Sequence, residues 1–219
     1  MDEPIVIDTG PSPSSVVVVL HGLGADGSDF APICEMLDLR AVGAVRFVLP
    51  HAPARPVTAN GGYVMRAWYD ILAFGGGAGE DEAGLRQSRS AIDALIGLER
   101  SRGVASERII VAGFSQGCAM ALMVGLRHGE TLGGIAGMSG YLPLAATTAA
   151  ERSGANRDTP VWLAHGRRDP IVPIARGVAT RDVLQALGQP VDWHEYAIEH
   201  TVSAEEVGDL QSWLVSRLG

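Results

Sequence analysis

Short apolar segments that alternate with segments of helical periodicity constrain the fold of this chain more than any other feature. Most of the apolar segments are continuous and rich in Val and Ile, as is typical of strands covered on both faces. They are residues 16–20, 45–49, 109–112, 134–138, 161–164 and 191–196. Residues 81–102 and 203–218 instead repeat apolar side chains at helical spacing, and Ser203 with Glu206 predicts a capping box at the start of the second helix. This alternation predicts an α/β fold with a mostly parallel central sheet and helices on both faces.

The chain length indicates one domain rather than two, because α/β folds of 219 residues commonly form a single unit. We therefore interpret the irregular residues 50–62, 75–79 and 145–159 as loops over one sheet, where functional sites are commonly built. The longest aliphatic run, residues 16–20, is far shorter than the ~20 apolar residues that span a bilayer. The acids Asp2 and Glu3 stand where a signal peptide would carry basic residues. We expect a cytoplasmic protein with no stable membrane insertion.

The charged residues and the cysteines exclude several kinds of chemistry. The net charge of −8 disfavours a nucleic-acid partner. All 17 basic residues are Arg, so the chain has neither a Schiff-base lysine nor the lysine of a phosphate-binding loop. Cys34 and Cys118 are too few for a zinc cage or a disulfide framework. We expect two buried thiols, although the sequence leaves a bridge between them open.

Residues 22–27 fit the G-x-G-x-x-G pattern of dinucleotide-binding loops and follow a predicted strand. That fingerprint also requires an acid at the end of the next strand, where it holds the ribose. The next predicted strand, residues 45–49, is followed by Pro50 and His51 instead. The sequence therefore disfavours a nucleotide cofactor.

Residues 113–117 read Gly-Phe-Ser-Gln-Gly, which matches the G-x-S-x-G pattern of a nucleophile elbow. The pattern alone carries little weight, but here it lies between a predicted strand and the apolar residues 118–123 that begin a predicted helix. Such a strand–turn–helix holds the serine at a strained turn and presents its hydroxyl above the sheet. Ser115 is therefore the candidate nucleophile; the alternative is a serine that only caps a buried helix.

A serine nucleophile needs a histidine base and a carboxylate that orients this base. In this topology the partners follow in the order serine, acid, histidine. His200 lies in the loop after the last predicted strand, and Asp169 follows the strand at residues 161–164, so both lie at the edge of the sheet where the elbow lies. We predict a triad of Ser115, Asp169 and His200. Of the other downstream histidines, we expect His128 to face solvent, His165 to make a structural hydrogen bond and His194 to lie on the face of the sheet.

Nearly the whole chain resembles the small α/β-hydrolases of the phospholipase/carboxylesterase family, which includes the acyl-protein thioesterases. The motifs that carry the resemblance occur in order at residues 21–27, 50–53, 65–70, 113–117, 139–143, 165–173 and 196–200. Residues 60–62, Asn-Gly-Gly, are similar to the bacterial carboxylesterase branch. The resemblance implies one α/β-hydrolase domain over residues 1–219 without a large lid. It also implies an oxyanion hole made by the backbone N–H groups of Leu23 and Gln116, which explains the glycines of residues 22–27.

The resemblance further places an acyl groove along Trp68, Ile71, Leu72 and Phe74. The alternative is that Trp68 and Ile71 only pack their loop against the core. We expect a serine carboxylesterase that hydrolyses short- to medium-chain esters of small molecules through an acyl-enzyme and needs no cofactor and no metal. Thioesters and lysophospholipids are alternative substrates, as for an acyl-protein thioesterase or lysophospholipase. Members of this family often dimerise, which leaves a homodimer open.

Two other classes compete with this interpretation. A non-catalytic binding protein on the same fold would be expected to lack a triad residue, and this chain has all three. An enzyme like the dienelactone hydrolases usually carries cysteine as the nucleophile, whereas position 115 is serine and Cys118 lies about one helical turn further on.

Overall fold

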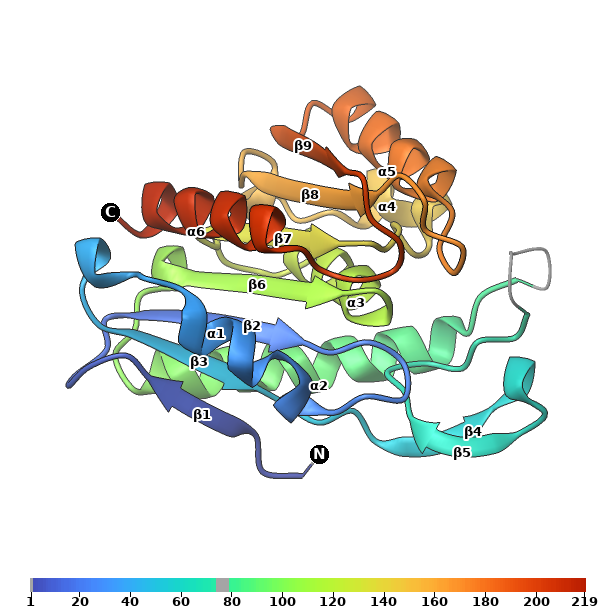
Figure 1. Cartoon of the computed structure of the whole chain (residues 1–219), viewed down its shortest axis with the longest axis horizontal. Helices are drawn as coiled ribbons and strands as arrows, with labels where there is room; N and C mark the ends of the chain where they lie inside the picture. The colour runs from blue at the N-terminus through green and yellow to red at the C-terminus, as the bar shows by residue number, and fades with distance from the viewer. Residues whose placement is uncertain (1, 74–78) are drawn as a thin grey trace.

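A seven-stranded sheet forms the centre of the computed structural model, which describes residues 2–73 and 79–219 (Figure 1). The strand order is β1-β3-β2-β6-β7-β8-β9, and only β1 runs antiparallel to its neighbour. The strands are β1 (Ile5–Asp8), β2 (Ser15–Leu20), β3 (Val45–Leu49), β6 (Ile109–Phe114), β7 (Gly134–Met138), β8 (Val161–Gly166) and β9 (Val191–Tyr196). Every residue of β2 and β7 is buried, as their apolar sequences predict.

Helices cover both faces of this sheet, which confirms the predicted fold class. The helices are α1 (Ala31–Met36), α2 (Glu82–Ser101), α3 (Gln116–Gly125), α4 (Ala145–Glu151), α5 (Ile174–Ala186) and α6 (Ala204–Leu218). Helices α1 and α6 share one apolar cluster with the sheet, and α2, α3 and α5 share the other (Figure 1). Short 3-10 turns occupy Gly27–Phe30, Arg40–Val42, Thr58–Asn60, Ser106–Arg108 and Gly154–Asn156. Within residues 2–73 and 79–219, no helix has the length and apolar character needed to cross a bilayer.

Three strands were not predicted from the sequence, and one helix lies in a segment that was predicted as a loop. The edge strand β1 has only three apolar residues, and its side chains alternate between partly buried and exposed. The hairpin of β4 (Ala54–Val57) and β5 (Tyr63–Arg66) falls largely in the predicted loop at residues 50–62, because its strands are short and only Val57 among their residues is buried. Likewise, α4 falls in the predicted loop at residues 145–159. Only Thr148 of this helix is buried, so it shows no apolar stripe.

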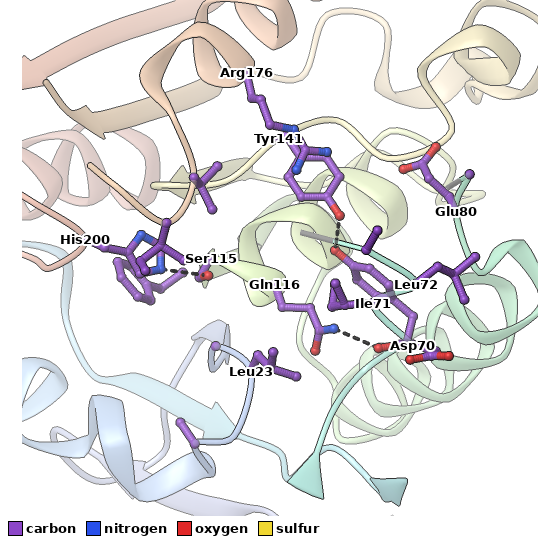
Figure 2. A pocket seen from close by; sticks show the side chains of 18 of the residues that line it. Leu23, Asp70, Ile71, Leu72, Glu80, Ser115, Gln116, Tyr141, Arg176 and His200 are labelled. Atoms are coloured by element: carbon purple, nitrogen blue, oxygen red, sulfur yellow. Dashed lines mark hydrogen bonds between the residues drawn. The ribbon is translucent and has the colours of Figure 1, made fainter. Parts of the chain in front are cut away.

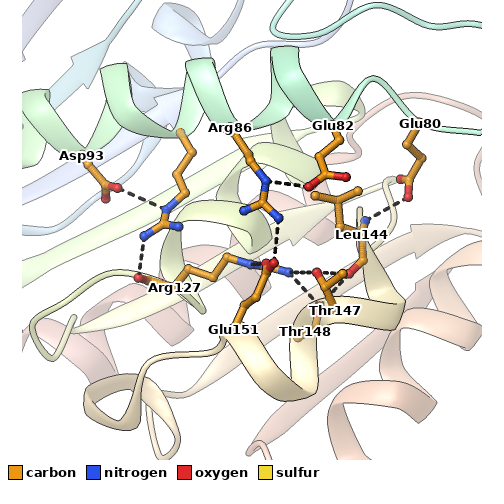
Figure 3. A network of polar contacts seen from close by, with 10 residues as sticks. Glu80, Glu82, Arg86, Asp93, Arg127, Leu144, Thr147, Thr148 and Glu151 are labelled. Atoms are coloured by element: carbon orange, nitrogen blue, oxygen red, sulfur yellow. Dashed lines mark hydrogen bonds and ion pairs between the residues drawn. The ribbon is translucent and has the colours of Figure 1, made fainter.

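A buried arginine joins three of the helices (Figure 3). The side chain of Arg127, just beyond α3, has no exposed surface, and its Nε donates a hydrogen bond of 2.8 Å to Glu151 in α4. Arg86 of α2 donates to the same carboxylate at 2.6 Å. The two guanidinium groups lower the pKa of Glu151 to about 2. This network fixes the segment that follows β7 against the helical layer.

The capping box predicted at the start of α6 is only half formed. The Ser203 hydroxyl accepts a hydrogen bond from the backbone N–H of Glu206 at 3.1 Å, as predicted. The Glu206 carboxyl does not accept a hydrogen bond from the backbone N–H of Ser203, which a complete capping box requires. Glu206 is fully buried, and neither of its carboxyl oxygens has a hydrogen-bond partner among the described residues. Burial raises the pKa of Glu206 from its usual 4.5 to about 7.

We expect Glu206→Gln to stabilise the protein at pH 8 and to have little effect at pH 5. A carboxyl whose folded pKa exceeds its unfolded pKa binds the proton more tightly in the folded state, so stability falls as the pH rises from 4.5 through about 7. Above pH 7 the free energy of unfolding is lower by up to roughly 3 kcal/mol. The glutamine variant has no carboxyl at this position and does not lose this stability. Melting temperatures between pH 5 and 8 check this, with the exposed neighbour Glu205→Gln as the control. Parallel pH curves for wild type and Glu206→Gln would contradict it.

Candidate active site

The turn between β6 and α3 holds Ser115 in a strained backbone conformation, with φ 56° and ψ −116°. The flanking glycines make so tight a turn feasible. A side chain on Gly113 would overlap the backbone of Gly117, and a side chain on Gly117 would overlap the carbonyl group of Leu20 in the neighbouring strand. The predicted nucleophile elbow is therefore present in its expected geometry, at the carboxyl end of the central strand β6.

The structure brings the three predicted triad residues together. His200, in the loop between β9 and α6, has its Nε2 2.9 Å from the Ser115 hydroxyl (Figure 2). Its Nδ1 lies 2.7 Å from Oδ2 of Asp169, which follows β8. The ring of Phe114 packs against the imidazole with 4.7 Å between the ring centroids. A serine, a histidine and a carboxylate thus form one continuous hydrogen-bonded chain.

The surroundings of Asp169 determine which nitrogen of His200 carries the proton. The Asp169 side chain has no exposed surface. Its Oδ1 accepts hydrogen bonds from the backbone N–H groups of Ile171 and Val172, both at 2.8 Å, which leaves Oδ2 for the histidine. A carboxylate can only accept here, so Nδ1 of His200 donates. Nε2 then has its lone pair directed at the Ser115 hydroxyl, which is the arrangement that a general base requires.

The other downstream histidines have structural positions. His165 is buried, its Nε2 donates to the carbonyl of Val172 at 2.8 Å, and burial lowers its pKa. It thereby holds the loop that carries Asp169, as predicted. His194 lies on β9 against the ring of Trp162. The expectation that His128 faces solvent is wrong: this side chain is largely buried, and its Nδ1 lies 2.9 Å from Asp93 of α2.

The loop after β2 lies beside the nucleophile, and an unpredicted histidine orients it. Nδ1 of the buried His21 donates to the carbonyl of Gly22 at 2.7 Å, and its Nε2 accepts the backbone N–H of Ala52 at 3.0 Å. Because the carbonyl of the Gly22–Leu23 peptide faces His21, the N–H of the same trans peptide points the opposite way. The only sequence signal for this role was the position of His21 directly before the glycine loop.

The two N–H groups expected to form the oxyanion hole are free to bind a ligand. Neither the backbone N–H of Leu23 nor that of Gln116 donates a hydrogen bond to another described residue, and both residues line the cavity over Ser115. Gln116 also begins α3, where the helix dipole favours negative charge. Gly22 lies close to Ser115, so a glycine there leaves the backbone room beside the nucleophile. This arrangement accounts for the G-x-G-x-x-G pattern without a dinucleotide.

The side chain of Gln116 joins the elbow to the predicted acyl segment. Its amide oxygen accepts the backbone N–H of Trp68 at 2.8 Å. Its amide nitrogen donates to the carbonyl of Tyr69, also at 2.8 Å (Figure 2). This pair of contacts fixes residues 68 and 69 against the nucleophile. Sequence reasoning assigned Gln116 only a backbone role and missed these two bonds.

A cavity of about 520 Å³ opens over Ser115, within the size range of small-molecule sites. Ile71 and Leu72 line it, as expected for an acyl groove. The expectation for Trp68 is wrong: its ring is fully buried outside the cavity lining, and its indole N–H donates to the carbonyl of His21 at 2.9 Å. Trp68 therefore supports the loop after β2. Phe74, the fourth predicted groove residue, lies outside the described residues.

Cys118 and Cys34 are both buried, free thiols. Burial raises the pKa of each to about 12, so neither is a thiolate near neutral pH. Among the described residues, no group of three or more His, Cys, Asp or Glu side chains could hold a metal ion. The reactive group that the cavity presents is the Ser115 hydroxyl.

Residues 1–217 match the family described as phospholipase/carboxylesterase. The chain belongs to the phospholipase/carboxylesterase family. It is therefore a serine hydrolase that acts on esters, and the predicted resemblance is confirmed at the level of the family.

Relatives within the phospholipase/carboxylesterase family have similar lengths. Acyl-protein thioesterase 1 of Gibberella zeae is 38% identical over 224 residues, which cover 98% of this chain and 95% of the relative. The crystal structure of SOBER1 from Arabidopsis thaliana is 30% identical and has a TM-score of 0.88 over 94% of this chain and 99% of that one. The crystal structure of esterase PE8 is 26% identical, with a TM-score of 0.84 over 98% of both chains. Fungal acyl-protein thioesterases reach 36–39% identity, so the expected placement in a bacterial branch is not supported.

Proposed function

We propose that this chain hydrolyses carboxylic esters with short to medium acyl chains through an acyl-enzyme on Ser115. The observation that carries the proposal is the hydrogen-bonded chain from Ser115 through His200 to Asp169, with distances of 2.9 and 2.7 Å, beneath a cavity of about 520 Å³. In this proposal, residues 1–219 form a single domain. The reaction needs no cofactor and no metal.

In the first half of the reaction, Nε2 of His200 accepts the proton of the Ser115 hydroxyl while the serine oxygen attacks the substrate carbonyl. Asp169 stabilises the imidazolium that forms, because its carboxylate faces the Nδ1 proton. The carbonyl oxygen becomes an oxyanion, which the N–H groups of Leu23 and Gln116 bind. One such donor contributes about 3–4 kcal/mol in comparable sites.

Acylation is complete when His200 gives the proton to the leaving oxygen, or to the leaving sulfur of a thioester, and the acyl group stays on Ser115. Water then attacks the acyl-enzyme while His200 accepts its proton. His200 passes this proton to the Ser115 oxygen as its bond to the acyl group breaks, so the carboxylic acid leaves and the serine hydroxyl is restored. The triad thus acts identically on esters and thioesters, and the cavity has to determine which of them is preferred.

The acyl chain lies along Ile71 and Leu72 in this proposal. Both side chains line the cavity, and the Gln116 contacts to residues 68 and 69 hold their segment in place. Each methylene buried there contributes up to ~0.8 kcal/mol of binding to the transition state. The value of kcat/KM should therefore rise with acyl length until the cavity is filled.

We expect Leu72→Trp to move the preferred acyl length of 4-nitrophenyl esters towards shorter chains. The larger ring occupies the part of the cavity next to residue 72 and shortens the space for an acyl chain, so octanoate should lose about tenfold or more in kcat/KM relative to acetate. A series of esters from acetate to decanoate measures this. Leu98→Trp, on the exposed side of α2, is the matched control. Equal losses for every ester together with a lower melting temperature would remove Leu72 from the substrate site and leave the triad assignment standing.

A second candidate function is an acyl-protein thioesterase or lysophospholipase. It is favoured by the names of the fungal relatives, which are acyl-protein thioesterases, at 36–39% identity. A direct comparison of 4-nitrophenyl butyrate, an S-acylated peptide, an acyl-coenzyme A and a lysophospholipid separates the candidates, with Ser115→Ala as the blank. A kcat/KM at least tenfold higher for the S-acylated peptide than for the ester would replace the first proposal with the second.

A further inference from the structure

The catalytic cavity contains an arginine that no acid neutralises at close range. Arg176, in α5, lies with its guanidinium carbon 3.4 Å from the centre of the Tyr141 ring (Figure 2). Both residues line the same cavity as Ser115 and His200. A charged group in this place is not needed for the esterase mechanism, so it requires a separate explanation.

No Asp or Glu among the described residues lies within ion-pair distance of Arg176, and no hydrogen bond from its guanidinium is present there. Residues 1 and 74–78 include no Asp or Glu. By contrast, Arg181, one and a half turns further along α5, donates to Asp182 at 2.7 Å. Among the described residues, nothing accepts a hydrogen bond from the Arg176 guanidinium, so its N–H donors are available there to a ligand in the cavity.

The acids that share the cavity are engaged elsewhere or lie in solvent. Glu80 accepts the backbone N–H of Leu144 at 3.0 Å (Figure 3). Asp70 accepts the backbone N–H and the hydroxyl of Thr58, at 2.7 and 2.5 Å. Asp29, the third acid, is exposed. Because a charge interaction weakens with distance and with solvent, these acids leave the close surroundings of Arg176 open to an anion.

A second donor lies beside the guanidinium. The hydroxyls of Tyr141 and Tyr69 are 2.8 Å apart, so one O–H donates to the other oxygen (Figure 2). Tyr69 is buried and its hydroxyl has no other partner among the described residues, so leaving its proton unbonded would be costly. Tyr69 is therefore the donor of this pair. The Tyr141 proton stays free to point into the cavity.

We propose that Arg176 and the Tyr141 hydroxyl form a carboxylate subsite for the far end of the acyl chain. The substrates it fits are monoesters or monothioesters of dicarboxylic acids, in which the second carboxylate is ionised at neutral pH. A guanidinium fork next to a phenolic O–H supplies the donors that a carboxylate accepts. The subsite lies on the acyl side because Tyr69, which holds Tyr141, is continuous in the chain with Ile71 and Leu72. The inference rests on the proposed esterase function and specifies its substrate class.

Two esters of equal chain length test the subsite: 4-nitrophenyl hexanoate, and the mono-4-nitrophenyl ester of adipic acid, in which a carboxylate replaces the terminal methyl group. We expect Arg176→Gln to lower the ratio of kcat/KM, adipate over hexanoate, by about 10- to 100-fold, as for other hydrogen bonds to charged groups. Arg176→Lys should retain part of the ratio, and Tyr141→Phe should lower it about three- to tenfold. Arg181→Gln, on the same helix but outside the cavity lining, is the matched control and should keep the wild-type ratio.

The failure of this inference can be distinguished from failure of the esterase proposal. If wild type hydrolyses the hexanoate and Arg176→Gln leaves the adipate-to-hexanoate ratio within twofold, the carboxylate subsite is wrong and the esterase proposal stands. If wild type hydrolyses neither ester, the esterase proposal itself is wrong. A third ester, 4-carboxyphenyl hexanoate, carries the carboxylate on the alcohol side. If Arg176→Gln selectively lowers kcat/KM for this ester, the subsite does not lie on the acyl side.

Discussion

Replacement of Ser115 by alanine should lower kcat for 4-nitrophenyl butyrate by roughly 10⁴-fold or more, because the hydroxyl forms the acyl-enzyme and no neighbouring group can replace it. The buried thiol of Cys118 is protonated, its pKa having risen to about 12, so it cannot act as a substitute nucleophile. Folding should be retained, since the Ser115 backbone N–H still donates to the carbonyl of Met138 at 2.9 Å. Stopped assays and thermal melting of the same preparation measure both properties.

A pair of histidine variants completes this test. His200→Ala should reduce kcat as severely as Ser115→Ala, since triad residues act as a unit. His194→Ala should cost only a modest loss of rate or stability, because His194 contacts Trp162 and Asp192 and not the nucleophile. Equal losses in two folded histidine variants, or more than a few per cent of activity in Ser115→Ala, would refute the assignment of the triad.

The sequence predicted those parts of the fold that are buried on both sides. Strands such as Val45–Leu49 and Gly134–Met138 have the predicted bounds, because burial on two faces leaves a continuous apolar run. The α2 helix was also predictable, because Asp81 caps it and apolar residues recur along one face. The hairpin Ala54–Val57 and Tyr63–Arg66 was missed because only Val57 among its strand residues is buried, and β-propensity alone is a weak signal.

The candidate triad residues could be found in the sequence for a related reason. A nucleophile elbow is local, and the order of the strands places Asp169 and His200 at the same edge of the sheet. The contacts that hold the loops of the site in place could not be predicted, because a hydrogen bond from the His21 imidazole to a backbone carbonyl leaves no pattern in the sequence. Similarly, Trp68 reads as an apolar aromatic whether it lines a groove or lies buried beneath one. Arg176 is one of 17 basic residues, and only the three-dimensional arrangement shows that it lacks an acidic partner.

Asp169→Asn should lower kcat by about 10⁴-fold at pH 7 although it changes a single atom type, because the wrong tautomer of His200 would be stabilised. The backbone N–H groups of Ile171 and Val172 both donate to Oδ1 of Asp169. The asparagine amide must therefore keep its oxygen on their side and turn its NH₂ group towards His200. An NH₂ group can only donate, so Nδ1 of the histidine has to accept and its proton moves to Nε2. Nε2 then has no lone pair for the proton of Ser115, and general-base catalysis is lost.

The tautomer itself can be measured in this variant. With ¹⁵N-labelled histidine, the His200 signals should report a proton on Nδ1 in wild type and on Nε2 in Asp169→Asn. Asp192→Asn, which removes the acid 3.0 Å from His194, is the matched control and should change neither kcat nor the His200 signals. If Asp169→Asn keeps more than about a tenth of wild-type kcat while His200 changes tautomer, Asp169 does not act by setting the protonation of His200. If instead the proton stays on Nδ1 and kcat still falls 10⁴-fold, the negative charge of Asp169 supports catalysis rather than its control of the tautomer. That charge would act by stabilising the imidazolium that forms as Ser115 attacks.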